Sequence, residues 1–187
     1  MARAERGDRY TRVAIWLHWV IAAFVLYNLT GGIYGSFLPE TAPNPLFSGH
    51  KALGITILFL SLARLAWRLT HRPPPLPAMP RWQAGSAHAL HWLFYVLIIL
   101  MPLSGWIFSS AGMKRWPLNW FGLFDIPYLP IAQSVTGGAP AFTFHVYAGW
   151  IMAGLVMLHI AAALKHHLVD RDRTLARMLP GAEPRQG

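Results

Sequence analysis

Two histidines, His145 and His159, lie fourteen residues apart in an apolar segment that is long enough to cross a bilayer. At about 100° and 1.5 Å per residue, fourteen residues of α-helix return to nearly the same face and advance roughly 21 Å. One helix therefore offers an imidazole near each membrane surface, and both imidazoles lie on the same face of that helix. Because a histidine inside a membrane span is costly, it indicates a functional site. The separation predicts ligands for two haem irons stacked across the membrane.

The composition places the chain in the membrane class. Its 187 residues are 55% hydrophobic and 12% charged, whereas soluble domains carry about 25% charged residues. Apolar runs of about 20 residues are long enough to span a bilayer as helices. We therefore expect an all-α membrane protein, a bundle of four transmembrane helices forming one domain over residues 1–187. The predicted spans cover residues 13–34, 46–70, 86–110 and 142–168.

The net charge of +9 is distributed as a topology signal. Basic residues gather at the ends of the spans and not on one polar face, which argues against a nucleic-acid partner. Of the 16 Lys and Arg residues, all but Lys51, Lys114 and Arg115 lie in the N-terminal tail, around the second connection or at the C-terminal end. By the positive-inside rule, this bias places both termini on the cytoplasmic side.

The absence of cysteine limits the possible chemistry. Disulfides, thiolate–zinc sites and covalent attachment of haem through a C-x-x-C-H motif are excluded. Any haem must then be held by axial ligands and packing alone, which defines a b-type site.

The topology assigns a depth to each histidine. His50 and His145 fall near the outer surface, and His18 and His159 near the inner one, where His88 or His91 could compete as ligands. An isolated interfacial histidine is more often a hydrogen-bonded residue than a ligand. We prefer the interpretation as hydrogen-bonded interface residues for the histidines at basic span ends, which are His71, His166 and His167. Depth-matched pairs are harder to attribute to chance, since each buried imidazole costs free energy.

Other residues at these depths fit the same arrangement. Gly32 lies fourteen residues beyond His18, where a glycine would let a flat macrocycle approach the helix. Arg64 lies fourteen residues beyond His50, where a guanidinium could pair with a haem propionate. Gly54 and Gly149 follow His50 and His145 by one turn and remove bulk beside the proposed ring. The alternatives are ordinary small-residue helix packing and a snorkelling arginine.

An iron with two histidine ligands has no vacant position, so such a haem passes electrons and does not bind oxygen. Two of them, one above the other, would connect the outer and inner surfaces. A transporter or structural bundle that uses its histidines for protons is the non-redox alternative.

Several stretches together resemble the bacterial cytochrome b561 family, small four-helix membrane proteins with two haems. The resemblance covers roughly residues 9 to 180, and its motifs are RYTRVAIWLHW, GHKALGITILFLSLARLAWRL, AHALHWLFYVLIILMPLSGW, FHVYAGWIMAGLVMLHIAAALKHHLVDRD and TLARMLP.

The resemblance implies two b haems in the bacterial inner membrane, with ligands at His18, His50, His145 and His159. It also implies electron exchange with membrane quinone. One member type oxidises superoxide at the outer surface and delivers the electron to ubiquinone. Related cytochromes b serve as membrane subunits of hydrogenases and other dehydrogenases.

Two functional hypotheses follow. In the first, a free-standing oxidoreductase attracts superoxide to Lys51, Lys114 and Arg115 on the outer face, since a positive patch raises the encounter rate of a small anion. In the second, the chain is an electron-carrying anchor for a partner dehydrogenase, docked on the aromatic outer connection. A quinone needs an apolar groove and a proton donor, for which we nominate His88 and His167.

Overall fold

The computed structural model describes residues 9–38, 45–113, 115 and 117–181. Within these ranges four helices are long and apolar enough to cross a membrane. They are α2 (Arg12–Ser36), α3 (Pro45–Thr70), α4 (Arg81–Ala111) and α5 (Ala139–Lys165). The expected four-helix membrane architecture is confirmed, and the chain is a multi-pass membrane protein.

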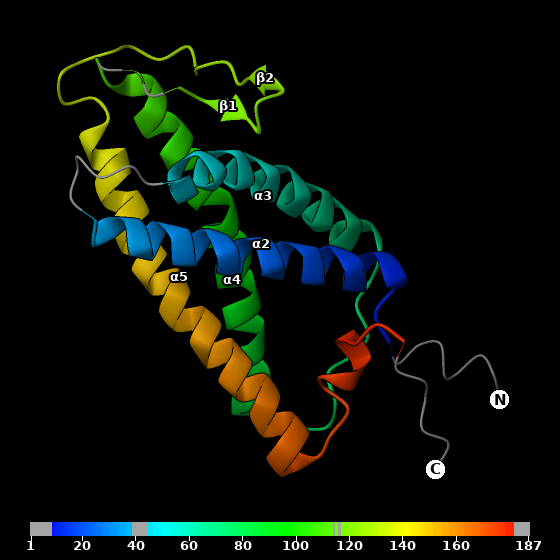
Figure 1. The fold of residues 1–187 in the computed structure, drawn as a ribbon. Helices are drawn as coiled ribbons and strands as arrows, with labels where there is room; N and C mark the ends of the chain where they lie inside the picture. The colour runs from blue at the N-terminus through cyan, green and yellow to red at the C-terminus, as the bar shows by residue number, and fades with distance from the viewer. Residues whose placement is uncertain (1–8, 39–44, 114, 116, 182–187) are drawn as a thin grey trace.

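The helices pack as two neighbouring pairs, joined mainly through α3 and α4 and more weakly through α2 and α5. α2 lies along α3, α4 lies along α5, and α3 also packs on α4. In Figure 1, α2 crosses in front of the α4–α5 pair. Between α4 and α5, Leu97, Ala148 and Met152 form a buried apolar cluster. This contact fixes the depth of α5 relative to α4.

The helix ends follow from local chemistry. Thr11 caps α2, its hydroxyl accepting a hydrogen bond from the Ala14 amide at 3.2 Å. α5 starts at Ala139, three residues before the predicted start, because Pro140 in the first turn lacks only an amide that the helix does not need there. After Lys165 the chain makes a π-helical turn, His166–Asp170, and a left-handed residue, Arg171, ends it.

One predicted boundary is wrong. α4 begins at Arg81, not at Ser86, so its first turn contains Arg81, Trp82 and Gln83, which directly follow a proline-rich linker over residues 72–80. The last linker proline, Pro80, precedes the helix, and its carbonyl accepts bonds from the amides of Gln83 and Ala84. Pro102 lies inside α4, as expected.

The connection between α4 and α5 contains a small hairpin that the sequence did not reveal. β1 (Asn119–Trp120) pairs antiparallel with β2 (Phe124–Asp125). The hairpin lies against α3, as Figure 1 shows at the top of the bundle. Ile55, Leu118 and Ile126 form the buried cluster beneath it. The Trp120 indole also donates to the Thr56 hydroxyl at 3.0 Å, so the connection is fastened to the bundle.

Candidate functional site

The levels are called outer and inner after the predicted topology, the outer one being nearer the hairpin. At the outer level, α3 and α5 bring two imidazoles together. The ring centroids of His50 and His145 are 5.8 Å apart, with the ring planes at 79°. A metal ion bound at about 2 Å from one nitrogen of each of two facing imidazoles holds their centroids about 6 Å apart. The pair therefore fits a single iron.

Hydrogen bonds orient both outer rings. His50 Nδ1 lies 3.1 Å from the carbonyl oxygen of Asn28, and His145 Nδ1 lies 2.9 Å from that of Met101. A carbonyl oxygen only accepts, so each Nδ1 carries the proton and each Nε2 keeps its lone pair. Metal-binding histidines commonly show this arrangement. Ser104 Oγ, itself bonded to the Met101 carbonyl, lies 3.1 Å from the same His145 nitrogen.

Glycines on the two neighbouring helices make room for these rings. A Cβ on Gly32 of α2 would lie 3.2 Å from His50 Cε1, and one on Gly105 of α4 would lie 3.3 Å from His145 Cε1. Both distances are shorter than ordinary van der Waals contact. Gly32 was singled out from the sequence, whereas Gly105 was missed, although counting depth along the third span would have placed it level with His145.

The other two predicted glycines contact neighbouring helices. A Cβ on Gly54 would meet Asn28 Nδ2, and one on Gly149 would meet Met101 Cε, each at an ordinary 3.7 Å. These contacts correspond to small-residue helix packing, the alternative interpretation of both positions.

At the inner level three imidazoles converge. The rings of His18 and His159 are 6.3 Å apart at 77°, and His91 of α4 lies 5.8 Å from His159 at 75°. Both separations fit a shared metal, so distance alone does not select the partner of His159. His88 is exposed on α4. Of the two inner competitors, the structure places His91 in this group.

Arg64 lies beside the inner group. Its guanidinium donates to His18 Nδ1 at 3.0 Å, and its Cζ is 5.9 Å from the centre of the Tyr95 ring. Among the described residues every salt bridge lies at the end of α5, and none of their carboxylates pairs with Arg64. A partly buried cation that has no anion among the described residues fits the propionate of a haem at this level.

The cations predicted for the outer face are engaged with the α4–α5 connection. Lys51 donates to the carbonyl of Pro117 at 3.1 Å, and the Arg115 guanidinium lies 4.6 Å from the centre of the Tyr128 ring. Lys114 lies outside the described residues. Lys51 and Arg115 thus belong to one surface around the fastened connection.

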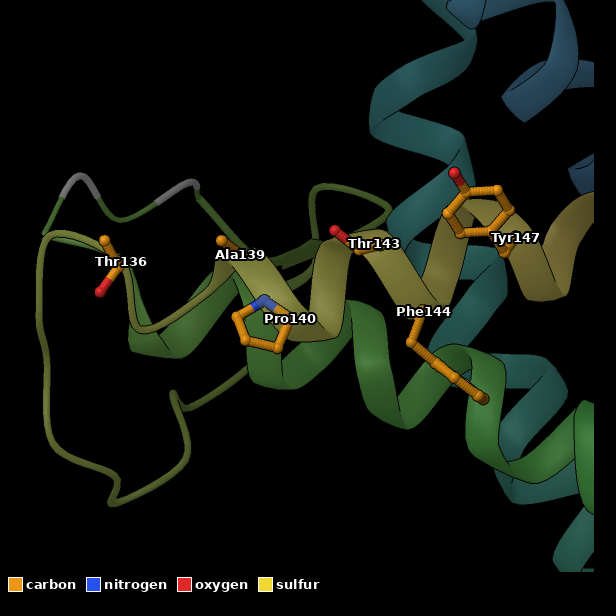
Figure 2. Close-up of a pocket in the computed structure, with 6 residues that line it drawn as sticks. All are labelled: Thr136, Ala139, Pro140, Thr143, Phe144 and Tyr147. Carbon is orange, nitrogen blue, oxygen red and sulfur yellow. The ribbon is translucent and has the colours of Figure 1, made fainter.

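The two quinone candidates are not brought together by any contact. His88 is exposed near the start of α4, and His167 is exposed in the π-turn. A small pocket at the inner end has other walls, among them Tyr10, Arg64, Arg68 and Tyr95. A second, open groove at the outer end of α5 is lined by Thr136, Ala139, Pro140, Thr143, Phe144 and Tyr147, drawn in Figure 2. Its wall includes neither quinone candidate.

Two of the histidines at basic ends, His71 and His166, have local partners. His71 stacks on Trp67 with ring centroids 3.7 Å apart. His166 Nδ1 lies 2.6 Å from Asp172 Oδ2 and 3.2 Å from Asp170, whose carboxylate also binds Lys165 at 2.6 Å. Although His166, Asp170 and Asp172 are close enough to hold a metal ion, the Lys165 ammonium already supplies a cation there.

Outside the spans, one carboxyl has a displaced pKa. Burial raises the pKa of Asp172, but hydrogen bonds from Thr174 and His166 outweigh burial and hold it below its ordinary value. The Thr174 amide donates to Asp172 Oδ1 at 2.8 Å.

Four apolar helices with paired imidazoles at two levels define a membrane protein of the b-type cytochrome class. The chain belongs to the prokaryotic cytochrome b561 family, whose model matches residues 9–181. The family is one of membrane electron-transfer proteins with haem b, so the chain is an oxidoreductase at that level.

Relatives of several kinds are similar over nearly the whole chain. Cytochrome b561 homolog 2 of Escherichia coli is 32% identical over 96% of this chain and 95% of its own. A probable superoxide oxidase CybB of Yersinia pestis is 28% identical, over 92% and 96%. A probable Ni/Fe-hydrogenase B-type cytochrome subunit of Azotobacter vinelandii is 24% identical, over 89% and 83%.

Proposed function

We propose that the chain binds two b haems, the outer between His50 and His145 and the inner between His18 and His159. The pairing of imidazoles at two levels carries the proposal, because ring separations of 5.8 and 6.3 Å each fit one iron. At the outer level each Nδ1 meets a backbone carbonyl, so Nε2 is the nitrogen through which each ring would bind iron. Arg64 would pair with a propionate of the inner haem, while Gly32 would make room for the His50 ring at the outer one.

Haem stoichiometry tests this assignment. The purified protein should hold two haems per chain, and His50→Ala or His18→Ala should each leave one. His91→Ala should keep both, since a porphyrin iron offers only two axial positions. Loss of a haem from His91→Ala but not from His18→Ala would transfer the ligand role to His91, and fewer than two haems in the unaltered protein would refute the dihaem proposal.

The proposed reaction moves electrons from the outer surface to membrane quinone. Superoxide gives up one electron and leaves as dioxygen, and two such electrons with two protons convert ubiquinone to ubiquinol. The similarity to a probable superoxide oxidase supports this substrate, as does the basic outer surface that contains Lys51 and Arg115. We place the protein in the bacterial inner membrane with both termini in the cytoplasm, as the charge bias requires.

Reduction kinetics test the outer substrate. Superoxide should reduce the haems faster at low salt than at high salt, because salt screens the attraction of a small anion. Reversing the charges at Lys51, Lys114 and Arg115 should slow this reduction and leave reduction by a neutral donor unchanged. Equal rates with superoxide and a neutral donor, unaffected by salt, would rule the substrate out.

His88 and His167 remain the proposed proton donors at the quinone site. Replacing either by alanine should raise the KM for ubiquinone while the haem content stays at two. An unchanged KM in both variants would move the site elsewhere on the inner end.

A membrane-anchor role is the alternative, favoured by similarity to hydrogenase B-type cytochrome subunits. The hairpin offers exposed apolar side chains for docking, including Phe121, Leu123 and Phe124. A soluble redox partner that purifies in equal amount with the chain would support this role. Full quinone reduction by the isolated chain would argue against it.

A further inference from the structure

The histidines proposed to bind iron differ in what faces their Nδ1 atoms. At the outer level each Nδ1 meets a backbone carbonyl, of Asn28 for His50 and of Met101 for His145, at 3.1 and 2.9 Å. At the inner level His18 Nδ1 meets the guanidinium of Arg64 at 3.0 Å. A carbonyl only accepts a hydrogen bond and a guanidinium only donates one, so the two environments have opposite polarity.

We propose that Arg64, which lies against His18, gives the inner haem a higher reduction potential than the outer haem. The outer ligands have carbonyl oxygens at the corresponding positions. This inference rests on the proposed function, because it takes His18/His159 and His50/His145 as the two ligand pairs. Electrons that enter at the outer surface would then move inward to the more strongly oxidising centre.

The carbonyl acceptors at the outer level and the cation at the inner level both make the inner reduction potential the higher of the two. A carbonyl that accepts the Nδ1 proton makes the imidazole a stronger electron donor, which favours the ferric state and lowers the potential. The hydrogen bond from Arg64 requires a lone pair on His18 Nδ1. An iron-bound His18, protonated at Nδ1, would lose that bond and keep only the nearby positive charge of Arg64. Because reduction removes one positive charge from the iron, a fixed positive charge nearby favours the reduced state and raises the potential.

The outer level also has a nearby cation, Lys51, but its setting weakens it. The Lys51 side chain is half-buried, but its hydrogen bond to the Pro117 carbonyl is exposed, so water and salt screen its charge. Arg64 lies between helices in a partly buried contact with a ligand ring, where its charge is screened less. The effect of the inner cation on its ligands is therefore the stronger.

If Arg64 pairs with a haem propionate, the expected shift of the inner potential on loss of Arg64 keeps the same sign. Removing the guanidinium would leave the propionate charge uncompensated, and a nearby negative charge favours the ferric state. Loss of Arg64 therefore shifts the inner potential in the negative direction in either arrangement.

The test is a redox titration of the purified dihaem protein, followed by absorption and by electron paramagnetic resonance. The unaltered protein should titrate in two components. Arg64→Met should shift the higher one to more negative potential and leave the lower one in place, whereas Arg64→Lys, which keeps the charge, should retain most of the potential. His50→Ala assigns the components, because it removes the outer haem and should leave the higher one.

Arg68→Met is the matched control. Arg68 lies one turn further along α3, and its guanidinium is 5.9 Å from the Trp92 ring and 5.8 Å from the Tyr95 ring, so a positive charge is lost from the same region. Its shift should be smaller than that of Arg64→Met. An equal shift would show that the general charge of the inner end sets the potential and would overturn the role of Arg64.

The remaining outcomes separate this inference from the proposed function. Two intact haems whose potentials ignore Arg64→Met, or a shift confined to the lower component, overturn only the inference. Fewer than two haems per chain would refute the proposed function itself, as would electron paramagnetic resonance signals unlike those of an iron with two imidazole ligands. If Arg64→Met loses the inner haem, Arg64→Gln provides the uncharged comparison. Loss of that haem from both variants would make Arg64 a haem-retention residue and overturn the inference.

Discussion

The outer pair of imidazoles depends on two places where a side chain is missing. Gly32 on α2 and Gly105 on α4 each come within 3.4 Å of a ring carbon, measured from the position a Cβ would take. The contact partners are His50 for Gly32 and His145 for Gly105. Each ring is therefore confined from a different helix.

Gly105→Ala should disturb the outer site selectively. The added methyl would displace the His145 ring by a few tenths of an ångström and weaken its bond to the Met101 carbonyl, at a cost of about 1–3 kcal/mol. We expect lower haem content per chain and an altered outer resonance signal. Gly154→Ala on α5 is the control, since a Cβ there meets nothing within 4 Å. Equal haem content and equal spectra in the two variants would contradict the packing argument.

At the residue scale the sequence indicated the candidate histidine ligands but not the backbone carbonyls that orient them. The spacing of His145 and His159 on one helix, with depths set by charge, was enough to group the four ligand candidates. The Asn28 and Met101 carbonyls carry no side-chain signal, because any residue type has a carbonyl. Their position depends on how α2 and α4 rotate about their axes, which lateral packing decides. The same rotation brings His91 rather than His88 toward His159.

Among the secondary-structure elements, the β1–β2 hairpin holds Phe121 in a backbone conformation that phenylalanine does not favour. Phe121 has φ of 48° and Gly122 has φ of 80°, so both central residues of the turn are left-handed. Turns of this kind prefer Asn-Gly, because a left-handed residue with a bulky side chain costs about 1–2 kcal/mol. Phe121 is also 52% exposed, so burial of its side chain offsets little of that cost.

Phe121→Asn should therefore stabilise the hairpin, by up to about 1 kcal/mol. Amide hydrogen exchange gives the measurement, and the Leu123 amide, which donates to the Trp120 carbonyl at 2.9 Å, should exchange more slowly. Phe124→Asn is the control, because Phe124 stacks on Trp120 in a strand position without a positive φ. That variant should exchange faster. Faster exchange in Phe121→Asn as well would show that the exposed ring holds the hairpin against the membrane.

The turn after α5 should respond to acid through Asp172. Its pKa is lowered in the folded protein, so its bonds stabilise the turn above the ordinary carboxyl pKa near 4 and lose this effect as pH falls through the lowered value. At neutral pH, Asp172→Asn should speed exchange of the Thr174 amide, which donates to Asp172. Because the site is at the surface, we expect less than about 1 kcal/mol.

This difference should disappear at pH values below the lowered pKa of Asp172, where the native carboxyl is protonated. Asp170→Asn is the control, since it removes the ion pair with Lys165 but none of the bonds from Thr174. It should leave exchange of the Thr174 amide unchanged. A difference between Asp172→Asn and the unaltered protein that persists unchanged into acid would mean that the carboxylate charge is not involved.

Hydropathy predicted the helices better than it predicted the connections. Apolar length fixes where a span must lie, so α2 and α3 begin and end within two residues of their predicted bounds. The start of α4 at Arg81 was missed because polar residues extend a helix beyond the apolar stretch. The hairpin was missed because its order comes from distant contacts, with Thr56 and with the buried cluster around Ile55.

For the whole molecule, the fastened connection and the turn after α5 lie at opposite ends of the bundle (Figure 1). The hairpin side contains Lys51 and Arg115, whereas the other side contains most of the basic residues. At that basic end, Arg9 donates to the Leu179 carbonyl at 2.8 Å and Trp19 to the Met178 carbonyl at 2.6 Å, which ties α2 to the C-terminal segment. The first and last parts of the described chain therefore share one membrane face.

The charge bias predicts which face is cytoplasmic, and single cysteines can test it because the chain has none of its own. Val135, 90% exposed in the connection after the hairpin, should lie outside, and the exposed Ala78 of the proline-rich linker should lie inside. In intact spheroplasts an impermeant maleimide should label Val135→Cys and spare Ala78→Cys, which should react only after permeabilisation. The reverse pattern would invert the topology. It would place His18 and His159 at the outer surface, so superoxide would meet the site next to Arg64 and not the one beside Lys51.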